Sequence, residues 1–228
     1  MGRNKRYANA ILQRLRPHDF DIVSADLRSV ELKRGTLLFE PDQSGPHTYF
    51  PINSVISFIG DTGEGSSVEV WAVGREGVAG ISGIMGATKP FRGIVQVSGN
   101  ALMCKTSTLR KQFLQRTSLH EALLKYFDFL LLQISYLGIC NTSHSIEHRF
   151  SRWLLMMQDR AQSPQLRFTQ DAIAGVLGTR RATISVAAAA LQDAGLIRYT
   201  PGSIQIRSRM ALEQAACSCY RIIKSRSR

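Results

Sequence analysis

The stretch FTQDAIAGVLGTRRATISVAAAALQDAGLI, which runs from Phe168 to Ile197, decides the fold. Apolar residues recur on both sides of Gly178 at spacings of three and four, the period of an amphipathic helix. We expect two short helices, the first capped by Thr169 and the second by Thr179, because a threonine oxygen can accept a bond from the free N–H groups of a first turn. Two short helices joined by a glycine-centred turn are the sequence form of a helix-turn-helix.

The second of these helices opens with side chains that suit DNA. Arginine, threonine and serine can bind phosphate oxygens and the edges of bases. The residues predicted to contact DNA are Thr179, Arg180, Arg181, Thr183 and Ser185. Thr179 is expected to lie beside a phosphate as well as to cap the helix.

The charge of the chain is uneven. The 228 residues carry a formal net charge of +12, from 29 Lys and Arg against 17 Asp and Glu. Residues 141–228 hold 13 of the basic and 5 of the acidic residues, whereas residues 1–140 hold the other 16 and 12. A basic surplus favours a polyanionic partner, and here it lies with the predicted helix-turn-helix. A basic surface kept for solubility is the alternative.

Hydropathy and cysteine use indicate the cytoplasm. No run reaches the roughly 18 apolar residues needed to span a bilayer, and the basic start MGRNKRYANA lacks the apolar core of a signal peptide. Four scattered cysteines do not form the dense framework of a small secreted scaffold. We therefore expect a cytoplasmic protein with reduced thiols and no membrane partner.

The first part of the chain predicts two short helices, over residues 8–15 and 17–29, and then a sheet. From Val30 to Lys105, short runs rich in β-branched and aromatic residues alternate with Gly, Pro, Asn and Asp. These runs are GTLLF, HTYF, SVISFIG, SVEVWAV, RGIVQV and ALMCK. They predict a small antiparallel β-barrel, sandwich or roll.

Glycine recurs every third residue in GREGVAGISGIMG, from position 74 to position 86. The pattern GxGxxG is absent, which excludes a dinucleotide fingerprint. Two interpretations stay open. The stretch is either a long turn whose backbone N–H groups cradle an anion, with Gly80 and Arg92 as candidate effector-binding residues, or a turn that is only flexible.

A long helix is expected from about Ser118 to residue 142. Apolar residues on one of its faces follow alternating spacings of four and three, which indicates a coiled-coil seam of about two heptads. The predicted seam comprises Leu123, Phe127, Leu130, Ile134 and Leu137. A second apolar stripe lies on another face, so the helix must be buried on two sides. We infer a homodimer through the seam; a core helix inside one monomer is the alternative.

A polar interval at residues 141–143 predicts a hinge. It divides the chain into an effector-sensing domain with the dimer helix, residues 1–142, and a DNA-binding domain, residues 143–228. Another helix is expected from about His144. After Ile197, two alternating runs flank Pro201-Gly202, which predicts a β-hairpin, or wing, and a last helix begins near Met210.

This order of β-roll, long helix, helix-turn-helix and wing resembles the Crp/Fnr family of bacterial transcription regulators over nearly the whole chain. The resemblance is carried most specifically by TQDAIAGVLGTRRATIS and LQDAGLI, and then by HRFSRWLL and VEVWAVGREGVAG. It implies an α+β fold in which a domain of the cyclic-nucleotide-binding type is coupled to a winged helix-turn-helix. It also implies a homodimer that reads a pseudo-palindromic operator in double-stranded DNA, responds to a small-molecule effector and contacts RNA polymerase.

The roll departs from the family pattern. Members that bind cyclic AMP have a Gly-Glu pair followed later by Arg-Ser, whereas EGVAGISG has no acidic residue after its glycine and the later pair is Arg92-Gly93. Cyclic AMP is therefore not expected. Members with an iron–sulfur cluster have N-terminal cysteines, whereas the first cysteine here is Cys104, so such a cluster is not expected either.

The recognition helix departs as well. Arg181 matches an arginine of the family, and Ser185 matches a serine of the Fnr branch. Ala182 and Val186 stand where the family commonly has a glutamate and an arginine. The operator sequence is therefore not predicted.

Metal binding was weighed at two groups of residues. Cys140, His144 and His148 are spaced as on one face of a continuous helix, a pattern that can bind zinc or copper, but the expected hinge falls inside it and an ordinary hinge contact is the alternative. Cys217 and Cys219 are two apart and would point to different sides of a helix, so neither a metal pair nor a disulfide is expected. We assign no metal ligand.

Catalysis is not expected. The patterns GxSxG, HExxH and the P-loop are absent, and the five histidines form no recognisable triad. A redox role for Cys104 or Cys140 stays open. Two alternatives to an effector-controlled regulator also stay open: a ligand-independent regulator controlled by its abundance, and a nucleotide- or metal-sensing module whose C-terminal domain docks a protein. A cavity in the roll too small or too apolar for a metabolite would favour the first.

Overall fold

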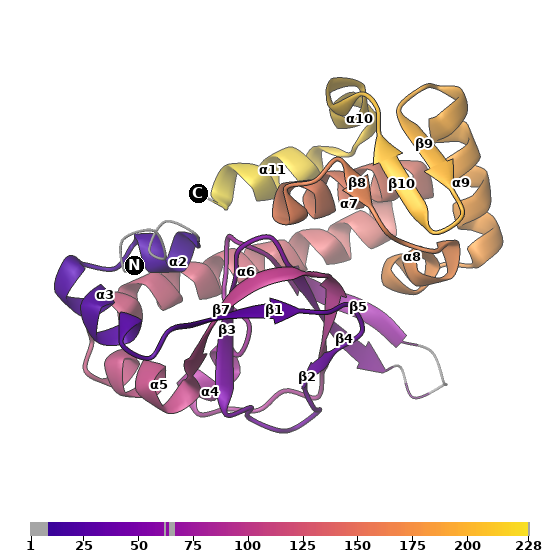
Figure 1. Cartoon of the computed structure of the whole chain (residues 1–228). Helices are drawn as coiled ribbons and strands as arrows, with labels where there is room; N and C mark the ends of the chain where they lie inside the picture. Colours follow the sequence, from indigo (N-terminus) through magenta and orange to yellow (C-terminus); the bar gives the residue numbers. More distant parts are fainter. Residues whose placement is uncertain (1–8, 62, 64–66, 228) are drawn as a thin grey trace.

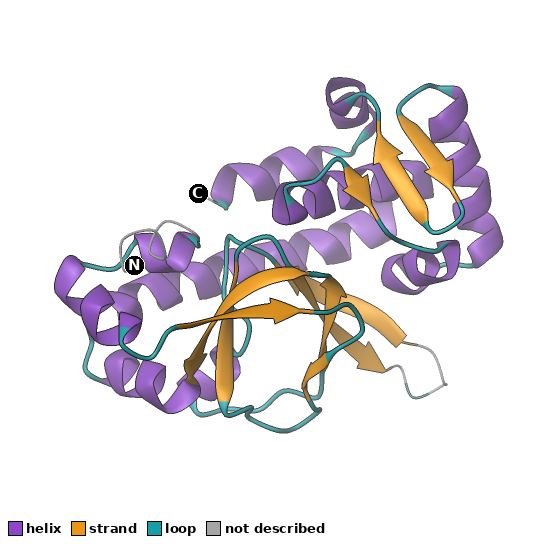
Figure 2. Cartoon of the chain, in the orientation of Figure 1, coloured by secondary structure: helices purple, strands orange, loops and turns teal. Residues whose placement is uncertain are grey.

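A β-roll, a long helix that crosses it and a winged domain make up the chain (Figures 1 and 2). The structure is a computed structural model that describes residues 9–61, 63 and 67–227. The winged domain lies at one end of the long helix, and the last helix runs back along it toward the N-terminal helices (Figure 1). The α+β architecture expected from the sequence is confirmed.

The roll consists of two antiparallel sheets, with strand orders β1-β7-β3 and β2-β6-β4-β5. The strands are β1 Arg28–Leu32, β2 Leu37–Phe39, β3 His47–Pro51, β4 Val55–Asp61, β5 Ser67–Val73, β6 Arg92–Val97 and β7 Gly99–Lys105. Each of the six β-branched or aromatic runs overlaps one of these strands, so the predicted sheet is confirmed. Aromatic side chains from β2, β4 and β5 fill the space between the strands.

Two short helices, α2 Ala10–Gln13 and α3 Pro17–Ser24, precede the roll. Residue 8, where the first helix was expected to begin, lies outside the described residues. The extension of the second helix to residue 29 is wrong, because β1 already begins at Arg28. Asp26 fixes this change of direction: its carboxylate accepts bonds from the Lys105 N–H at 3.0 Å and the Thr108 hydroxyl at 2.9 Å, which ties the segment to the end of β7.

A short helix, α4 Ile81–Met85, occupies part of the glycine-rich stretch. Gly80 precedes it with φ 101° and Gly86 ends it with φ 78°, backbone conformations that glycine adopts without strain. A Cβ on Gly80 would also lie 3.1 Å from the ring of Phe39. The stretch is therefore a helical turn packed against the roll, and the long open turn expected from the sequence is wrong.

Three helices connect the roll with the winged domain: α5 Thr106–Leu114, α6 Ser118–Ser143 and α7 Ile146–Ala161. α6 begins where the sequence predicts, but it continues through the polar residues 141–143. The helix is broken instead at His144, whose φ of −121° and ψ of 146° are extended. The apolar stripe predicted for the next helix is confirmed, since Phe150, Trp153, Leu154 and Met157 are all buried.

The winged domain consists of three strands and four helices. They are β8 Gln165–Leu166, α8 Gln170–Leu177, α9 Arg181–Asp193, β9 Ile197–Thr200, β10 Ser203–Ile206, α10 Arg209–Ala215 and α11 Ser218–Arg226. The predicted hairpin around Pro201-Gly202 is confirmed by the β9–β10 pairing. The single last helix expected from Met210 is wrong, because Ala216 and Cys217 are extended and separate α10 from α11.

The winged domain and α7 contact the roll directly. α8 packs against β5. The Arg34 guanidinium donates to the carbonyl of Arg167 and lies 5.2 Å from the ring centroid of Phe168. Farther along α7, Arg160 pairs with Glu76 of the roll. These contacts fix the orientation of the winged domain, and therefore of α9, relative to the roll.

Candidate nucleic-acid interface

The predicted helix-turn-helix is formed by α8 and α9. Thr169 caps α8 as expected, because its hydroxyl oxygen accepts the Ala172 N–H at 3.2 Å. Gly178 ends α8 in the left-handed region, with φ 60° and ψ 47°. The Thr179 N–H then donates to the carbonyl of Ala174 at 3.0 Å, which closes the end of the helix.

The cap position of α9 belongs to Arg180, and no side-chain bond caps this helix. The expectation that Thr179 caps α9 is therefore wrong. Its backbone is already engaged in ending α8, so it lies one residue before the cap. The α9 N-terminus keeps backbone N–H groups that a phosphate can bind.

Apolar packing fixes the face that α9 turns outward. The buried residues of the two helices share one core: Ile173, Ala174 and Leu177 from α8, and Ile184, Ala187, Ala188 and Leu191 from α9. The wing is attached to the same helix, because the Tyr199 N–H donates to the side-chain oxygen of Gln192 at 2.7 Å. The residues of α9 opposite this core are exposed.

The predicted DNA contacts lie on or beside that exposed face. Arg180, Arg181 and Ser185 are exposed, while Thr179 and Thr183 are half-buried. The Nε atom of Arg181 lies 3.8 Å from the carboxylate of Asp171 in α8, with both side chains about two-thirds exposed. Such a surface pair contributes little to stability, so DNA can replace it.

Sequence reasoning did not assign three further surface residues near this face. Val186, on α9, is 68% exposed, which is unusual for a large apolar side chain. Arg198 in β9 and Arg207 directly after β10 are exposed. An exposed valine among cations on a helix can contact the methyl group of thymine, while wing arginines can bind phosphates.

The residues predicted for the dimer seam all lie on α6, and two of them are buried inside the chain. Leu123 is fully buried in its own chain and Leu130 is only 6% exposed, so neither can meet a partner. Phe127, Ile134 and Leu137 are half-buried. The spacing of apolar residues identifies an apolar face of a helix, but it does not say whether the neighbour is the same chain or another.

The exposed apolar face of α6 begins one residue later. Leu124 and Leu131, seven residues apart, are 47% and 52% exposed, and Gly138 follows after another seven with open space above its Cα. Phe127 and Ile134 lie between them at the same alternating spacing. We call Leu124, Phe127, Leu131, Ile134 and Gly138 the outer seam.

α6 is also long and apolar enough, by length and composition alone, to cross a membrane. One such helix is weak evidence, because helices of soluble proteins pass the same test. Of its most apolar 18-residue window, 33% is buried inside the chain.

The interior of the roll is almost filled. The rings of Phe39, Phe58 and Trp71 form a stack with successive centroids 5.7 and 4.5 Å apart, and Phe91 meets Trp71 edge to face at 5.2 Å. The cavity left between this stack and α4, which Gly80 helps to line, has a volume of about 30 Å³. That is the space of about one water molecule.

Arg92 does not line this cavity. Its guanidinium lies 3.1 Å from the carboxylate of Asp61 and donates to the Ser67 hydroxyl at 2.7 Å, at the far end of the β4–β5 pair. The structure therefore does not bring Arg92 and Gly80 together around one cavity.

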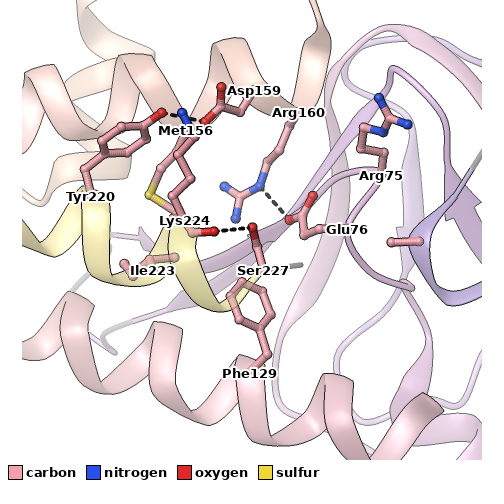
Figure 3. Close-up of a pocket in the computed structure, with 11 residues that line it drawn as sticks. Arg75, Glu76, Phe129, Met156, Asp159, Arg160, Tyr220, Ile223, Lys224 and Ser227 are labelled. Atoms are coloured by element: carbon pink, nitrogen blue, oxygen red, sulfur yellow. Dashed lines mark hydrogen bonds and ion pairs between the residues drawn. The ribbon is translucent and has the colours of Figure 1, made fainter. Parts of the chain in front are cut away.

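A larger cavity, of about 470 Å³, lies between the roll, α6, α7 and α11 (Figure 3). Its charged lining comprises Arg75, Glu76, Asp159, Arg160 and Lys224, and its apolar lining includes Phe129, Met156 and Ile223. The Tyr220 hydroxyl donates to Asp159 at 2.7 Å at one side of it. Sequence reasoning missed this cavity because its walls come from five separate segments, one of which is Ala10 of α2.

The cysteines and histidines group differently from what was expected. Cys140, His144, Cys217 and Cys219 come together, whereas His148 is turned toward Ser145, with its ring centroid 6.4 Å from that of His144. The expectation that Cys217 and Cys219 point apart is wrong, because Cys217 is the N-cap of α11 and not part of the helix.

The thiols of this group interact. A hydrogen bond from Cys217 holds the pKa of Cys140 well below its usual range, against the effect of burial, and the positive charge of Arg152 acts in the same direction. The same bond and burial raise the pKa of Cys217.

Comparison with known proteins agrees with this architecture. Residues 148–215 match the family described as the Crp-like helix-turn-helix domain. No curated protein is similar enough in sequence to match the chain.

Three solved structures illustrate the likeness of fold. A putative Crp/Fnr-family regulator from Eubacterium rectale is 16% identical, with a TM-score of 0.68 and coverage of 91% of this chain and 98% of that one. FixK2 from Bradyrhizobium japonicum is 15% identical, with a TM-score of 0.71 and coverage of 84% and 98%. CLP from Xanthomonas campestris, a c-di-GMP-responsive global regulator, is 15% identical, with a TM-score of 0.66 and coverage of 85% and 100%.

Proposed function

We propose that this chain, which has the Crp/Fnr fold and carries a Crp-like helix-turn-helix domain, is a dimeric transcription regulator that inserts α9 into the major groove of DNA. The observation that carries the proposal is the outward face of α9, where Arg180, Arg181, Ser185 and Val186 are all exposed on a helix anchored by its opposite side. Residues 143–228 are the DNA-binding domain, and residues 1–142 hold the roll and the dimer helix.

Each part of that face has a separate role. Arg180 and the N-terminal N–H groups of α9 bind phosphate, which sets the position of the helix without reading sequence. Arg181 and Ser185 read base edges, and Val186 recognises thymine methyl groups. Thr179 and Thr183, which are half-buried, contact the phosphates next to the groove.

Dimerisation takes place through the outer seam of α6. Two exposed leucines one heptad apart, followed by Gly138, allow the helices of two protomers to approach closely. A dimer with twofold symmetry places its two recognition helices about one turn of DNA apart and therefore reads an inverted repeat.

A cyclic nucleotide does not bind in the interior of the roll. A cavity of about 30 Å³ beside four packed aromatic rings is far smaller than the roughly 300 Å³ at which small-molecule sites begin. This observation supports a regulator that acts at the level of its own abundance, without an effector in the roll.

A second candidate is an effector in the cavity between the roll, α7 and α11. An effector shifts an equilibrium only if it binds one arrangement better than the other. A small molecule in the cavity of about 470 Å³ would touch Arg75 of the roll and Lys224 of α11 at once, so it would favour the arrangement seen in Figure 3. A regulator of either kind works in the cytoplasm beside RNA polymerase.

The proposal is tested with total genomic fragments in a gel-shift selection. The wild-type chain is expected to retain a small set of fragments in the presence of excess random competitor DNA. If the protein retains genomic fragments without sequence preference, the proposal that α9 recognises a specific operator is contradicted. Melting-temperature screening of the same protein with nucleotides and organic anions distinguishes the two candidates, because only the second predicts a concentration-dependent rise.

A further inference from the structure

Four side chains from two distant parts of the chain converge at the junction of α6 and α7. Cys140 lies in the last turn of α6 and His144 follows that helix; Cys217 caps α11 and Cys219 lies in its first turn. One ligand atom from each, three Sγ and a histidine nitrogen, all lie within 4.8 Å of one another. All three cysteines are free thiols and at most 7% exposed.

We propose that Cys140, His144, Cys217 and Cys219 bind one Zn²⁺ ion in a tetrahedral Cys₃His site. The assignment does not depend on the proposed DNA-binding function.

The geometry fits such a site closely. With Zn–S near 2.3 Å and Zn–N near 2.1 Å, a tetrahedron separates neighbouring ligand atoms by about 3.6–3.8 Å. The Sγ atoms of Cys140 and Cys217 are 3.4 Å apart, and Sγ of Cys219 lies 3.7 Å from Nδ1 of His144. No two ligand atoms of the group are more than 4.8 Å apart, so side-chain shifts of about 1 Å or less suffice to close the site.

The kinds of ligand atom in the group determine which metal ion it prefers. Three thiols and an imidazole suit a thiophilic ion such as Zn²⁺, and the combination is one of the common structural zinc sites. Mg²⁺ and Ca²⁺ require oxygen ligands, which this cluster does not offer.

The paths of the two segments explain why the four residues can meet. α6 ends when the His144 N–H donates to the carbonyl of Cys140 at 3.2 Å, and the extended backbone of His144 then turns its ring back toward that cysteine. At α11, Cys217 has φ −65° and ψ 157°, outside the helix. Its side chain can therefore point to the same side as that of Cys219.

A buried cation supplies a second, independent observation. Zn²⁺ with three thiolates and a neutral histidine carries a net charge of −1. Arg152 is only 2% exposed and lies beside Cys140, and its Nε atom has no hydrogen-bond partner among the described residues. A buried arginine needs compensating negative charge; beside the buried Glu69 carboxyl, with which Arg152 interacts, metal-bound thiolates would provide it on the side of Cys140.

The ion would fasten the winged domain to the dimer helix. α11 contacts α6 and α7, and the four ligands lie where these three helices meet. Because the ligands come together only in the folded chain, the binding free energy of the metal adds to the stability of this junction.

The test uses the full-length chain, purified with a reducing agent, stripped with a chelator and reloaded with Zn²⁺ or Co²⁺. Elemental analysis is expected to give one Zn²⁺ ion per chain. Co²⁺ is expected to produce the intense ligand-field bands of a tetrahedral site together with thiolate-to-cobalt charge transfer. Cys140→Ser and Cys219→Ser should each lose both signals.

Two variants serve as matched controls. Cys104→Ser removes the one cysteine outside the cluster, and His148→Ala removes the histidine next to it, so both should keep stoichiometric metal and an unchanged cobalt spectrum. Circular dichroism confirms that each variant is folded. For a variant that does not fold, alkylation of the wild type replaces it: adding the chelator should raise the reactivity of Cys140, Cys217 and Cys219 and leave that of the buried Cys104 unchanged.

Three results would overturn the assignment. They are substoichiometric metal in the reloaded wild type, a cobalt spectrum without thiolate charge transfer, and equal loss of metal in Cys104→Ser and Cys219→Ser. Persistence of a Cys140–Cys217 disulfide that excludes Zn²⁺, after purification with the reducing agent, would overturn it as well.

Discussion

Nε of Arg160 in α7 lies 2.8 Å from Oε1 of Glu76 in the roll, and their side chains are only 6% and 14% exposed. The same guanidinium donates to the side-chain oxygen of Gln133 in α6 at 3.0 Å. One arginine thus joins the roll, α6 and the helix that leads into the winged domain. Gly74 is needed beside it, because a Cβ there would lie 2.5 Å from the Arg160 side chain.

Arg160→Ala is expected to destabilise the chain by about 3–5 kcal/mol, because it leaves the Glu76 carboxylate buried without its partner. Glu76→Gln should cost less, since the amide oxygen can still accept the bond. Urea denaturation measures both. The control is Asp171→Ala, which breaks a 3.8 Å surface pair and should change stability by less than about 1 kcal/mol. Equal effects of Arg160→Ala and Asp171→Ala would contradict the role given to the buried pair.

Arg181→Ala is expected to weaken operator binding by about 1–3 kcal/mol, that is about 5- to 150-fold, and to relax the preference at one base pair. Arg198→Ala in the wing is the matched comparison. As a phosphate contact, it should weaken binding to operator and random DNA alike and reduce the salt dependence by about one unit. Fluorescence anisotropy at several salt concentrations separates the two. If Arg181→Ala weakens binding to operator and random DNA equally, Arg181 contacts a phosphate and not a base.

Leu131→Glu is expected to convert the dimer to a monomer, because it places a charge in the middle of the outer seam. Leu114→Glu on α5 alters a leucine that is 64% exposed outside this seam, and it should leave the dimer intact. Sedimentation measurements distinguish monomer from dimer. If Leu131→Glu remains dimeric while Leu114→Glu dissociates, the contact surface lies on α5 and not on the outer seam.

Hydrogen bonds between Asp19 and the first residue of α6 make the stability of the chain depend on pH in the acid range. Its carboxylate accepts the Ser118 hydroxyl at 2.5 Å and the Ser118 N–H at 2.8 Å, and these bonds, with a smaller effect of Arg16, lower the pKa of Asp19 despite burial. A lowered folded-state pKa gives stability that is present above the unfolded value, near 3.9, and is lost as the pH falls through the folded value.

Asp19→Asn should therefore reduce stability at neutral pH and flatten the loss of stability below about pH 4. Denaturation midpoints from pH 7 to pH 2 check this. An unchanged acid slope in Asp19→Asn would show that other carboxylates cause the acid sensitivity.

Features that depend on neighbouring residues in the chain could be predicted from the sequence. The strands, α8 with its Thr169 cap, the start of α6 and the wing follow from local periodicity and turn residues. Thr179 was misplaced by one residue because ending α8 and capping α9 compete for the same short turn. α10 and α11 were merged because no glycine or proline marks the break at Ala216.

Features that depend on distant partners could not be predicted. The spacing of Leu123 and Leu130 describes a dimer seam equally well, but the roll covers them. Arg92 binds Asp61 across the sheet, which only the strand register reveals. The Cys₃His group required that α11 return along α6, which places Cys217 and Cys219 beside Cys140.

The central claim, that α9 reads DNA within a twofold dimer, is tested most directly by selecting bound fragments from the whole genome and deriving their common sequence. We expect an inverted repeat whose half-sites are centred about 10 base pairs, one helical turn, apart. We also expect that Arg181→Ala broadens the preference at the same position in both halves. A common sequence without twofold symmetry, or fragments enriched equally by wild type and Arg181→Ala, would contradict this claim.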